Sequence, residues 1–232
     1  MRKLKAISNN AIIKQTIKDR RGNTNATKEY ATSFSTTSNG NIDLRNATAA
    51  DGNSAKLVFY TTTFGVCHTH QNGLFPMFTP GDLSALSKMN AYTPPASAGN
   101  PNFDDLLFNM MVVESNTSID IQDSPYGYVY IIFANNRNNF SNFHSILSDP
   151  RKVDVKNTEL TQMYQEEGNW NEVPQLQLAK TFLRYINDPS AMNFNISLYR
   201  CKLDNEFEIT ADWEKLTLNS TQQYGIQKKP CK

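Results

Sequence analysis

Histidine, cysteine and tryptophan are all scarce in this chain. Its 232 residues include three histidines, three cysteines and two tryptophans. No apolar run approaches the roughly 20 residues that cross a membrane as a helix, so the sequence predicts no transmembrane segment. The 23 basic and 22 acidic residues nearly balance, and no basic stripe is interleaved with aromatic residues. These features argue against a nucleic-acid-binding protein.

The N-terminus and the cysteines leave the cellular compartment open. Basic residues stand near the start of the chain, but no apolar stretch follows them, so no signal peptide is visible. Cys201 and Cys231 are candidates for a disulfide in an oxidising compartment. The alternative is that all three cysteines are free thiols.

Apolar periodicity and turn residues predict helices and strands that intermingle along the chain. Helices are expected at residues 4–21, 82–89, 157–167 and 174–187. Strands are expected at residues 29–35, 56–60, 64–70, 106–114, 126–134, 196–202 and 206–209, with turns at 38–41, 123–127 and 203–205. No repeat of fixed period is present. The pattern predicts an α/β (α+β) fold with a mixed central β-sheet flanked by helices.

The chemistry of the chain is concentrated where two of its histidines stand one residue apart. His68 and His70 end the expected strand 64–70, and residues i and i+2 of a strand point to the same face. Both imidazoles can therefore reach one point, and zinc accepts such ligands at about 2.0–2.2 Å. Asp82, at the start of the next expected helix, lies beyond a loop rich in glycine and proline and is a candidate third ligand. The sequence predicts a site for one zinc ion at these three residues.

Other interpretations of the same residues stay open. His68 and His70 are also compatible with ordinary strand positions, and Asp82 with the capping of a helix N-terminus. His144, the remaining histidine, is an alternative third ligand, which would make a three-histidine metal site with His68 and His70.

The spacing of these residues resembles the metal motif of the JAMM (JAB/MPN+) metalloprotease family. That motif is His-x-His, seven residues, and Ser-x-x-Asp, with a glutamate on an earlier strand. Here His68-Thr69-His70 is followed after eight residues by Thr79-Pro80-Gly81-Asp82, and Glu29 opens the earlier strand. Three positions depart from the family pattern: Gln71 stands where the family usually has proline, Thr79 replaces serine, and the loop is one residue longer.

The resemblance implies a function and a division of the chain. It implies that His68, His70 and Asp82 bind zinc, that Glu29 is the general acid/base, and that Thr79 stabilises the oxyanion. The expected function is zinc-dependent hydrolysis of a peptide or isopeptide bond in a protein or peptide substrate. The expected organisation is an N-terminal helix at 1–25, a JAMM-like metal-binding core at 26–135 with a cytidine-deaminase-like or JAB/MPN-like fold, and a C-terminal extension at 136–232.

Two further expectations come with the resemblance. Many MPN-type domains have lost their metal, so a metal-free or inactive binding or scaffold module is the alternative function. The segment around Phe78 to Leu83 also resembles uncharacterised JAB-like proteins of bacteria. The expected location is therefore that of a secreted or lipid-anchored bacterial protein whose leader has been removed, or otherwise the cytoplasm.

Overall fold

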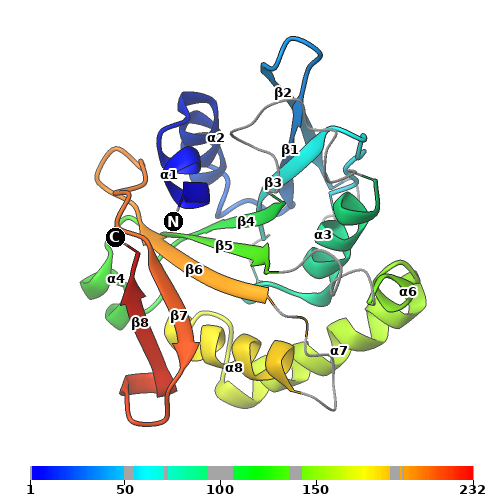
Figure 1. The fold of residues 1–232 in the computed structure, drawn as a ribbon. Helices are drawn as coiled ribbons and strands as arrows, with labels where there is room; N and C mark the ends of the chain where they lie inside the picture. The colour runs from blue at the N-terminus through cyan, green and yellow to red at the C-terminus, as the bar shows by residue number, and fades with distance from the viewer. Residues whose placement is uncertain are drawn as a thin grey trace.

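The protein is built from one large sheet with helices on both faces (Figure 1). The computed structural model describes residues 2–49, 55–70, 73–92, 107–135, 143–188, 194 and 196–231. The helices are α1 (Arg2–Ser8), α2 (Ala11–Arg21), α3 (Pro80–Tyr92), α4 (Ser118–Asp123), α6 (His144–Leu147), α7 (Pro150–Glu167) and α8 (Gln175–Asn187), with the 3-10 turn η1 (Gln223–Gly225). The strands are β1 (Tyr30–Thr36), β2 (Ile42–Thr48), β3 (Thr63–Thr69), β4 (Phe108–Val113), β5 (Tyr128–Ala134), β6 (Ile196–Lys202), β7 (Glu214–Leu218) and β8 (Ile226–Pro230). The expected α/β class with a mixed sheet is confirmed.

The eight strands form one sheet in the order β2-β1-β3-β4-β5-β6-β7-β8. β3 and β4 are parallel, and every other neighbouring pair is antiparallel. Parallel neighbours need a crossover connection, and α3 lies in the connection between β3 and β4. This crossover places the start of α3 directly after the loop that leaves β3.

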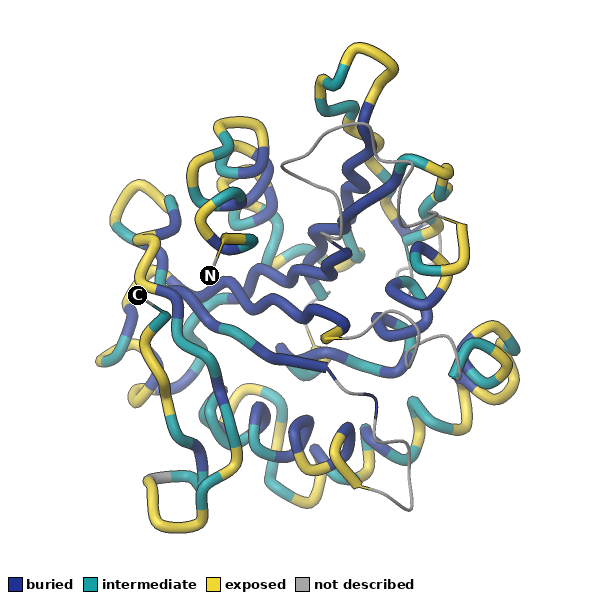
Figure 2. Tube along the Cα trace, in the orientation of Figure 1, coloured by how far each residue is buried: buried dark blue, intermediate teal, exposed yellow. Residues whose placement is uncertain are grey.

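Two hydrophobic cores cover the two faces of the sheet, and the central strands are buried along their whole length (Figure 2). One core joins α1 and α2 to one face, and it includes Phe34, Cys67 and Met110. The other joins α3, α7 and α8 to the opposite face, and it includes Val66 and Met111. Successive residues of β3 and β4 therefore point to different cores, as the two-residue period of a strand requires.

Several expected elements differ from those observed. The helix expected at 4–21 is two helices, because the Asn10 side chain accepts hydrogen bonds from the backbone of Ile12 and Ile13 and so starts a new helix. Residues 56–60 form no strand. The late hairpin at 206–209 is reduced to one bridge between Leu203 and Ile209, and the strand that pairs with β6 is β7.

Of the two alternatives for the cysteines, the structure shows the second: Cys201 and Cys231 form no disulfide, and all three cysteines are free thiols. Cys201 lies in β6, whereas Cys231 directly follows β8, and β7 lies between these two strands. Neighbouring strands are about 4.8 Å apart, so one intervening strand separates the two backbones by more than a disulfide spans.

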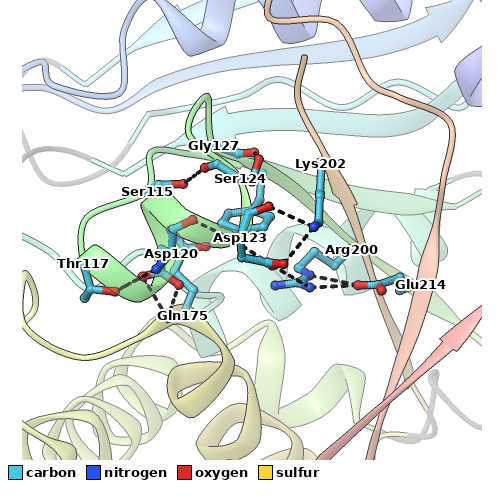
Figure 3. Close-up of polar contacts among 11 residues, drawn as sticks. Ser115, Thr117, Asp120, Asp123, Ser124, Gly127, Gln175, Arg200, Lys202 and Glu214 are labelled. Atoms are coloured by element: carbon cyan, nitrogen blue, oxygen red, sulfur yellow. Dashed lines mark hydrogen bonds and ion pairs between the residues drawn. The ribbon is translucent and has the colours of Figure 1, made fainter. Parts of the chain in front are cut away.

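The residues assigned to a C-terminal extension complete the same sheet. β6 pairs with β5 along seven residues, and β7 and β8 continue the sheet beyond it. Arg200 of β6 links this strand to α4 and to β7. Its side chain is 1% exposed and contacts carboxylate oxygens of Asp123 at 3.2 Å and Glu214 at 2.8 Å (Figure 3). Lys202 also pairs with Asp123, at 2.7 Å.

The same network joins α4 to α8. The Asp120 carboxylate accepts hydrogen bonds from the Thr117 hydroxyl at 2.7 Å and from the backbone N–H of Gln175, the first residue of α8, at 3.1 Å (Figure 3). Gln175 in turn donates from its side chain to the carbonyl of Glu114. A carboxylate on the first N–H of a helix satisfies one of its unpaired donors.

None of the helices described in the structure is long and apolar enough to cross a membrane.

Candidate metal centre

The two neighbouring histidines lie at the end of a fully buried central strand. His68 is in β3, and His70 follows the last residue of that strand. Both line one cavity, whereas Cys67 between Val66 and His68 points into the core on the α1–α2 side. The rings of His68 and His70 lie side by side, with centroids 5.2 Å apart. The strand geometry expected from the sequence is therefore present.

Asp82 brings its carboxylate between the two imidazoles. Its Oδ1 atom is 2.9 Å from Nε2 of His68, and its Oδ2 atom is 3.5 Å from Nε2 of His70. Each residue offers one ligand atom, and the three atoms lie within 4.8 Å of one another. A loop one residue longer than the family spacing therefore still delivers Asp82 to the histidine pair.

Each imidazole is held through its other ring nitrogen. Nδ1 of His68 is 3.1 Å from Oδ1 of Asn109, and Nδ1 of His70 is 2.8 Å from the carbonyl oxygen of Phe75. A carbonyl oxygen can only accept, so each Nδ1 carries the proton and each neutral ring has its lone pair on Nε2. Metal-binding histidines are commonly oriented in this way.

The surroundings of His68 fit a metal ion better than a hydrogen bond. Its Nε2 atom is buried and makes no hydrogen bond with any described residue, although Oδ1 of Asp82 approaches to 2.9 Å. A buried nitrogen without a hydrogen-bond partner is costly. Two imidazole nitrogens and a carboxylate oxygen are a donor set that zinc accepts.

Asp82 also caps α3, as the alternative interpretation of the sequence expected. Its Oδ2 atom accepts hydrogen bonds from the Thr79 backbone N–H at 2.7 Å and from the Thr79 hydroxyl at 2.9 Å. The Asp82 N–H lies 3.4 Å from the same hydroxyl oxygen. This reciprocal pair is a capping box, with Pro80 in the first turn, where its missing N–H costs nothing. Capping and ligation are thus compatible roles of one carboxylate.

Glu29 lies close to the cluster without belonging to it. It directly precedes β1, which pairs with β3 so that Ala31 lies opposite His68. The antiparallel register brings Glu29 to the level of His70, and both line the same cavity. One of its carboxylate oxygens accepts a hydrogen bond from the Ala55 N–H at 3.2 Å. Burial raises the pKa of Glu29, against the opposing effect of the two histidines.

The charges of the cluster are strongly coupled. Burial alone would lower the pKa of His70, but the nearby carboxylates of Asp82 and Glu29 raise it to about 9. Burial alone would raise the pKa of Asp82, but the two imidazoles hold it well below its usual range. Without a metal, a proton on Nε2 of His70 therefore balances the charge of Asp82.

The cavity beside the cluster has a volume of about 630 Å³. Glu29, Thr79 and all three members of the cluster line it. Its walls come from β1, β3, α3 and α7, so residues 150–165 of the second half of the chain contribute to the site. The arrangement offers metal ligands, a carboxylate and a hydroxyl around one space large enough for a substrate.

The third histidine is not part of this cluster. Nδ1 of His144, in α6, lies 3.1 Å from the hydroxyl of Ser87. Among the described residues, the group of possible ligands that includes the histidine pair is completed by Asp82. Of the two third ligands considered from the sequence, Asp82 is the one that the structure brings to His68 and His70.

Sequence reasoning missed the residues that orient the ligands. Asn109 accepts from His68 and also donates from Nδ2 to the carbonyl oxygen of Asp82 at 3.0 Å, so it joins two members of the cluster. Tyr164 of α7 donates to the carbonyl of Phe78 at 2.9 Å and packs its ring on Phe75, whose carbonyl holds His70. A polar residue inside the apolar run of β4 was the available signal for Asn109. No local pattern marks Tyr164.

Comparison of the chain with protein-family models, curated proteins and solved structures gives no significant match. The resemblance to the JAMM family therefore rests on the sequence motif alone.

Proposed function

We propose that this protein is a zinc-dependent hydrolase of peptide or isopeptide bonds, with a JAMM-like site on a JAB/MPN-like core. The observation that carries the proposal is the close cluster of His68, His70 and Asp82 in a cavity that Glu29 also lines. The Nε2 atoms of the two histidines and a carboxylate oxygen of Asp82 would hold the ion. When bound, zinc supplies a Lewis acid that polarises a carbonyl group and lowers the pKa of water.

Glu29 is the proton carrier in this proposal. Its carboxylate takes a proton from the attacking water and returns it to the leaving amine. Its raised pKa brings it nearer to neutrality, where a group that both accepts and donates a proton is most effective. Its position on the wall of the same cavity, outside the close cluster, suits a base rather than a fourth ligand.

Thr79 is the proposed oxyanion donor. It lines the cavity, but its hydroxyl proton is directed to Asp82. The hydroxyl must therefore turn from that carboxylate to the substrate oxygen during the reaction. A donor aimed at the developing negative charge would stabilise it.

Metal analysis of three proteins tests the ligand set. After zinc loading and dialysis, we expect one zinc per chain in the parent and none in Asp82→Ala. The matched control is Asp120→Ala, because the Thr117 hydroxyl donates to the Asp120 carboxylate and accepts from the Asp120 N–H at the start of α4, as Thr79 does with Asp82 at α3. The control should lose stability and keep its zinc. A folded parent that binds no zinc would favour a metal-free binding module instead.

Hydrolysis tests the role of Glu29 separately. The parent should cleave unfolded casein in the presence of zinc, and Glu29→Gln should bind zinc equally well without cleaving. Equal cleavage by the parent and by Glu29→Gln would show that Glu29 is not the base.

A further inference from the structure

One wall of the cavity is a polar stripe on α7. Asn157, Thr161 and Gln165 follow one another at intervals of four residues, and all three line the cavity. Residues four apart lie on the same face of a helix. The stripe belongs to the second half of the chain, outside the segment that carries the metal motif.

The stripe has hydrogen-bonding capacity that the fold does not use. Oδ1 of Asn157 accepts from the backbone N–H of Gly81 at 3.0 Å, which turns its Nδ2 group away from that contact. Within the described part of the chain, this is the one side-chain hydrogen bond that the three residues make. The side-chain hydrogen-bonding groups of Thr161 and Gln165 are therefore available to a ligand.

The stripe starts at the metal centre and has the length of a short extended peptide. Gly81, which Asn157 contacts, directly precedes the ligand Asp82. Eight residues of α-helix from Asn157 to Gln165 span about 12 Å, and an extended chain covers that distance in three to four residues. A peptide whose cleaved bond lies at the metal centre would thus run along α7.

The stripe carries no formal charge. Asn, Thr and Gln side chains both donate and accept, as the N–H and C=O groups of a peptide main chain require. Apart from Glu29 and the cluster itself, the charged residues of the cavity wall are Lys88 and Asp154, which have opposite charges and do not select an ion of one sign. The chemistry of the wall matches a neutral, extended main chain better than a charged ligand.

We propose that Asn157, Thr161 and Gln165 bind the main chain of an extended, uncharged peptide segment beside the cleaved bond. The position of that bond rests on the proposed hydrolase function, whereas peptide binding by the stripe does not.

Nuclear magnetic resonance measures this binding without turnover. The probe is acetyl-tetra-alanine amide, added to the zinc-loaded Glu29→Gln protein. We expect the chemical shifts of the side-chain amide groups of Asn157 and Gln165 to change progressively as the peptide concentration rises. The dissociation constant should rise about three- to tenfold in Thr161→Ala and in Gln165→Ala, the effect of one lost hydrogen bond.

The same helix supplies matched controls. Thr158 and Gln162 are exposed and do not line the cavity, and each repeats the residue type of Thr161 or Gln165 three residues earlier in α7. Thr158→Ala and Gln162→Ala should bind the probe as the unsubstituted protein does. Asn157→Asp retains the acceptor for Gly81 and removes the Nδ2 donor, so weaker binding by this variant would assign the donor to the peptide.

The outcomes separate this inference from the proposed function. Absence of any shift up to about 10 mM peptide, corresponding to a binding free energy weaker than about −3 kcal/mol, would overturn the inference. Equal weakening by the control variants, or shifts with a cello-oligosaccharide in place of the peptide, would also overturn it. Zinc- and Glu29-dependent cleavage of casein would in those cases leave the hydrolase proposal standing. Peptide binding at the stripe without any cleavage of casein would support the inference about the stripe and overturn the proposed hydrolase function.

Discussion

Asn109 should control the affinity of the metal centre although it is not a ligand. It is 1% exposed, accepts from Nδ1 of His68 and donates to the carbonyl oxygen of Asp82. Asn109→Leu removes both hydrogen bonds and keeps the number and branching of the side-chain heavy atoms. It leaves the Nδ1–H of His68 buried without an acceptor, so the imidazole is free to change its orientation or tautomer.

The expected loss follows from these two contacts. Each net hydrogen bond contributes about 1 kcal/mol, so two contribute about 2 kcal/mol. Loss of a residue that orients a metal ligand commonly weakens metal binding about 10- to 100-fold, which corresponds to about 1.4 to 2.7 kcal/mol. The two estimates agree, and we expect the zinc dissociation constant of Asn109→Leu to rise within that range.

A competition titration against a chromogenic zinc chelator measures this change. Gln175→Leu is the matched control, because Gln175 is also a fully buried amide but lies outside the cavity wall. Both variants should unfold at lower temperature, and only Asn109→Leu should bind zinc more weakly. An unchanged zinc affinity in folded Asn109→Leu would refute the orientation of His68 by Asn109.

Three further results are expected. Zinc affinity should fall about tenfold for each pH unit below 9 towards about pH 7, because zinc must displace the proton that His70 holds with a pKa of about 9; titrations at several pH values measure the slope. Removal of the capping hydroxyl should cost Thr79→Val and its control Thr117→Val about 1 kcal/mol of stability each. Only Thr79→Val should also lower the rate of casein cleavage at full zinc occupancy. Arg200→Leu should lower the free energy of unfolding in urea by about 3 kcal/mol, since it leaves two carboxylates without their buried partner; a loss below about 1 kcal/mol would contradict this assignment.

The sequence predicted the central strands and the cluster of candidate metal ligands, because those features are local. The apolar run ending at His68 and His70 marks a buried strand, and Asp82 stands at the start of a helix. β7 and β8 were missed because their sequences, EKLTL and IQKKP, are short and mostly polar. They are strands because β6 offers an open edge, which is a property of the folded sheet rather than of the segment.

Local sequence patterns could not predict the contribution of α7 to the site either. Tyr164 contacts Phe78 across 86 positions of the sequence, and Asn157 contacts Gly81 across 76. Pairings at this separation leave no periodic trace in either segment. The segment 136–232 was therefore expected as an extension of unknown role, whereas its helix α7 holds the loop that delivers Asp82.

Asp82 has two contacts that matter for the proposed metal centre, one to the start of α3 and one to the histidine pair. Its carboxylate caps α3 through Thr79, so the helix begins at the right residue whether or not an ion is bound. The proton on His70 balances its charge when zinc is absent. Two hydrophobic cores stabilise the sheet from both faces. A structural zinc site would show the reverse, since its ligands replace a core and the chain unfolds without metal. This arrangement supports the proposal of a catalytic ion over that of an ion that maintains the fold.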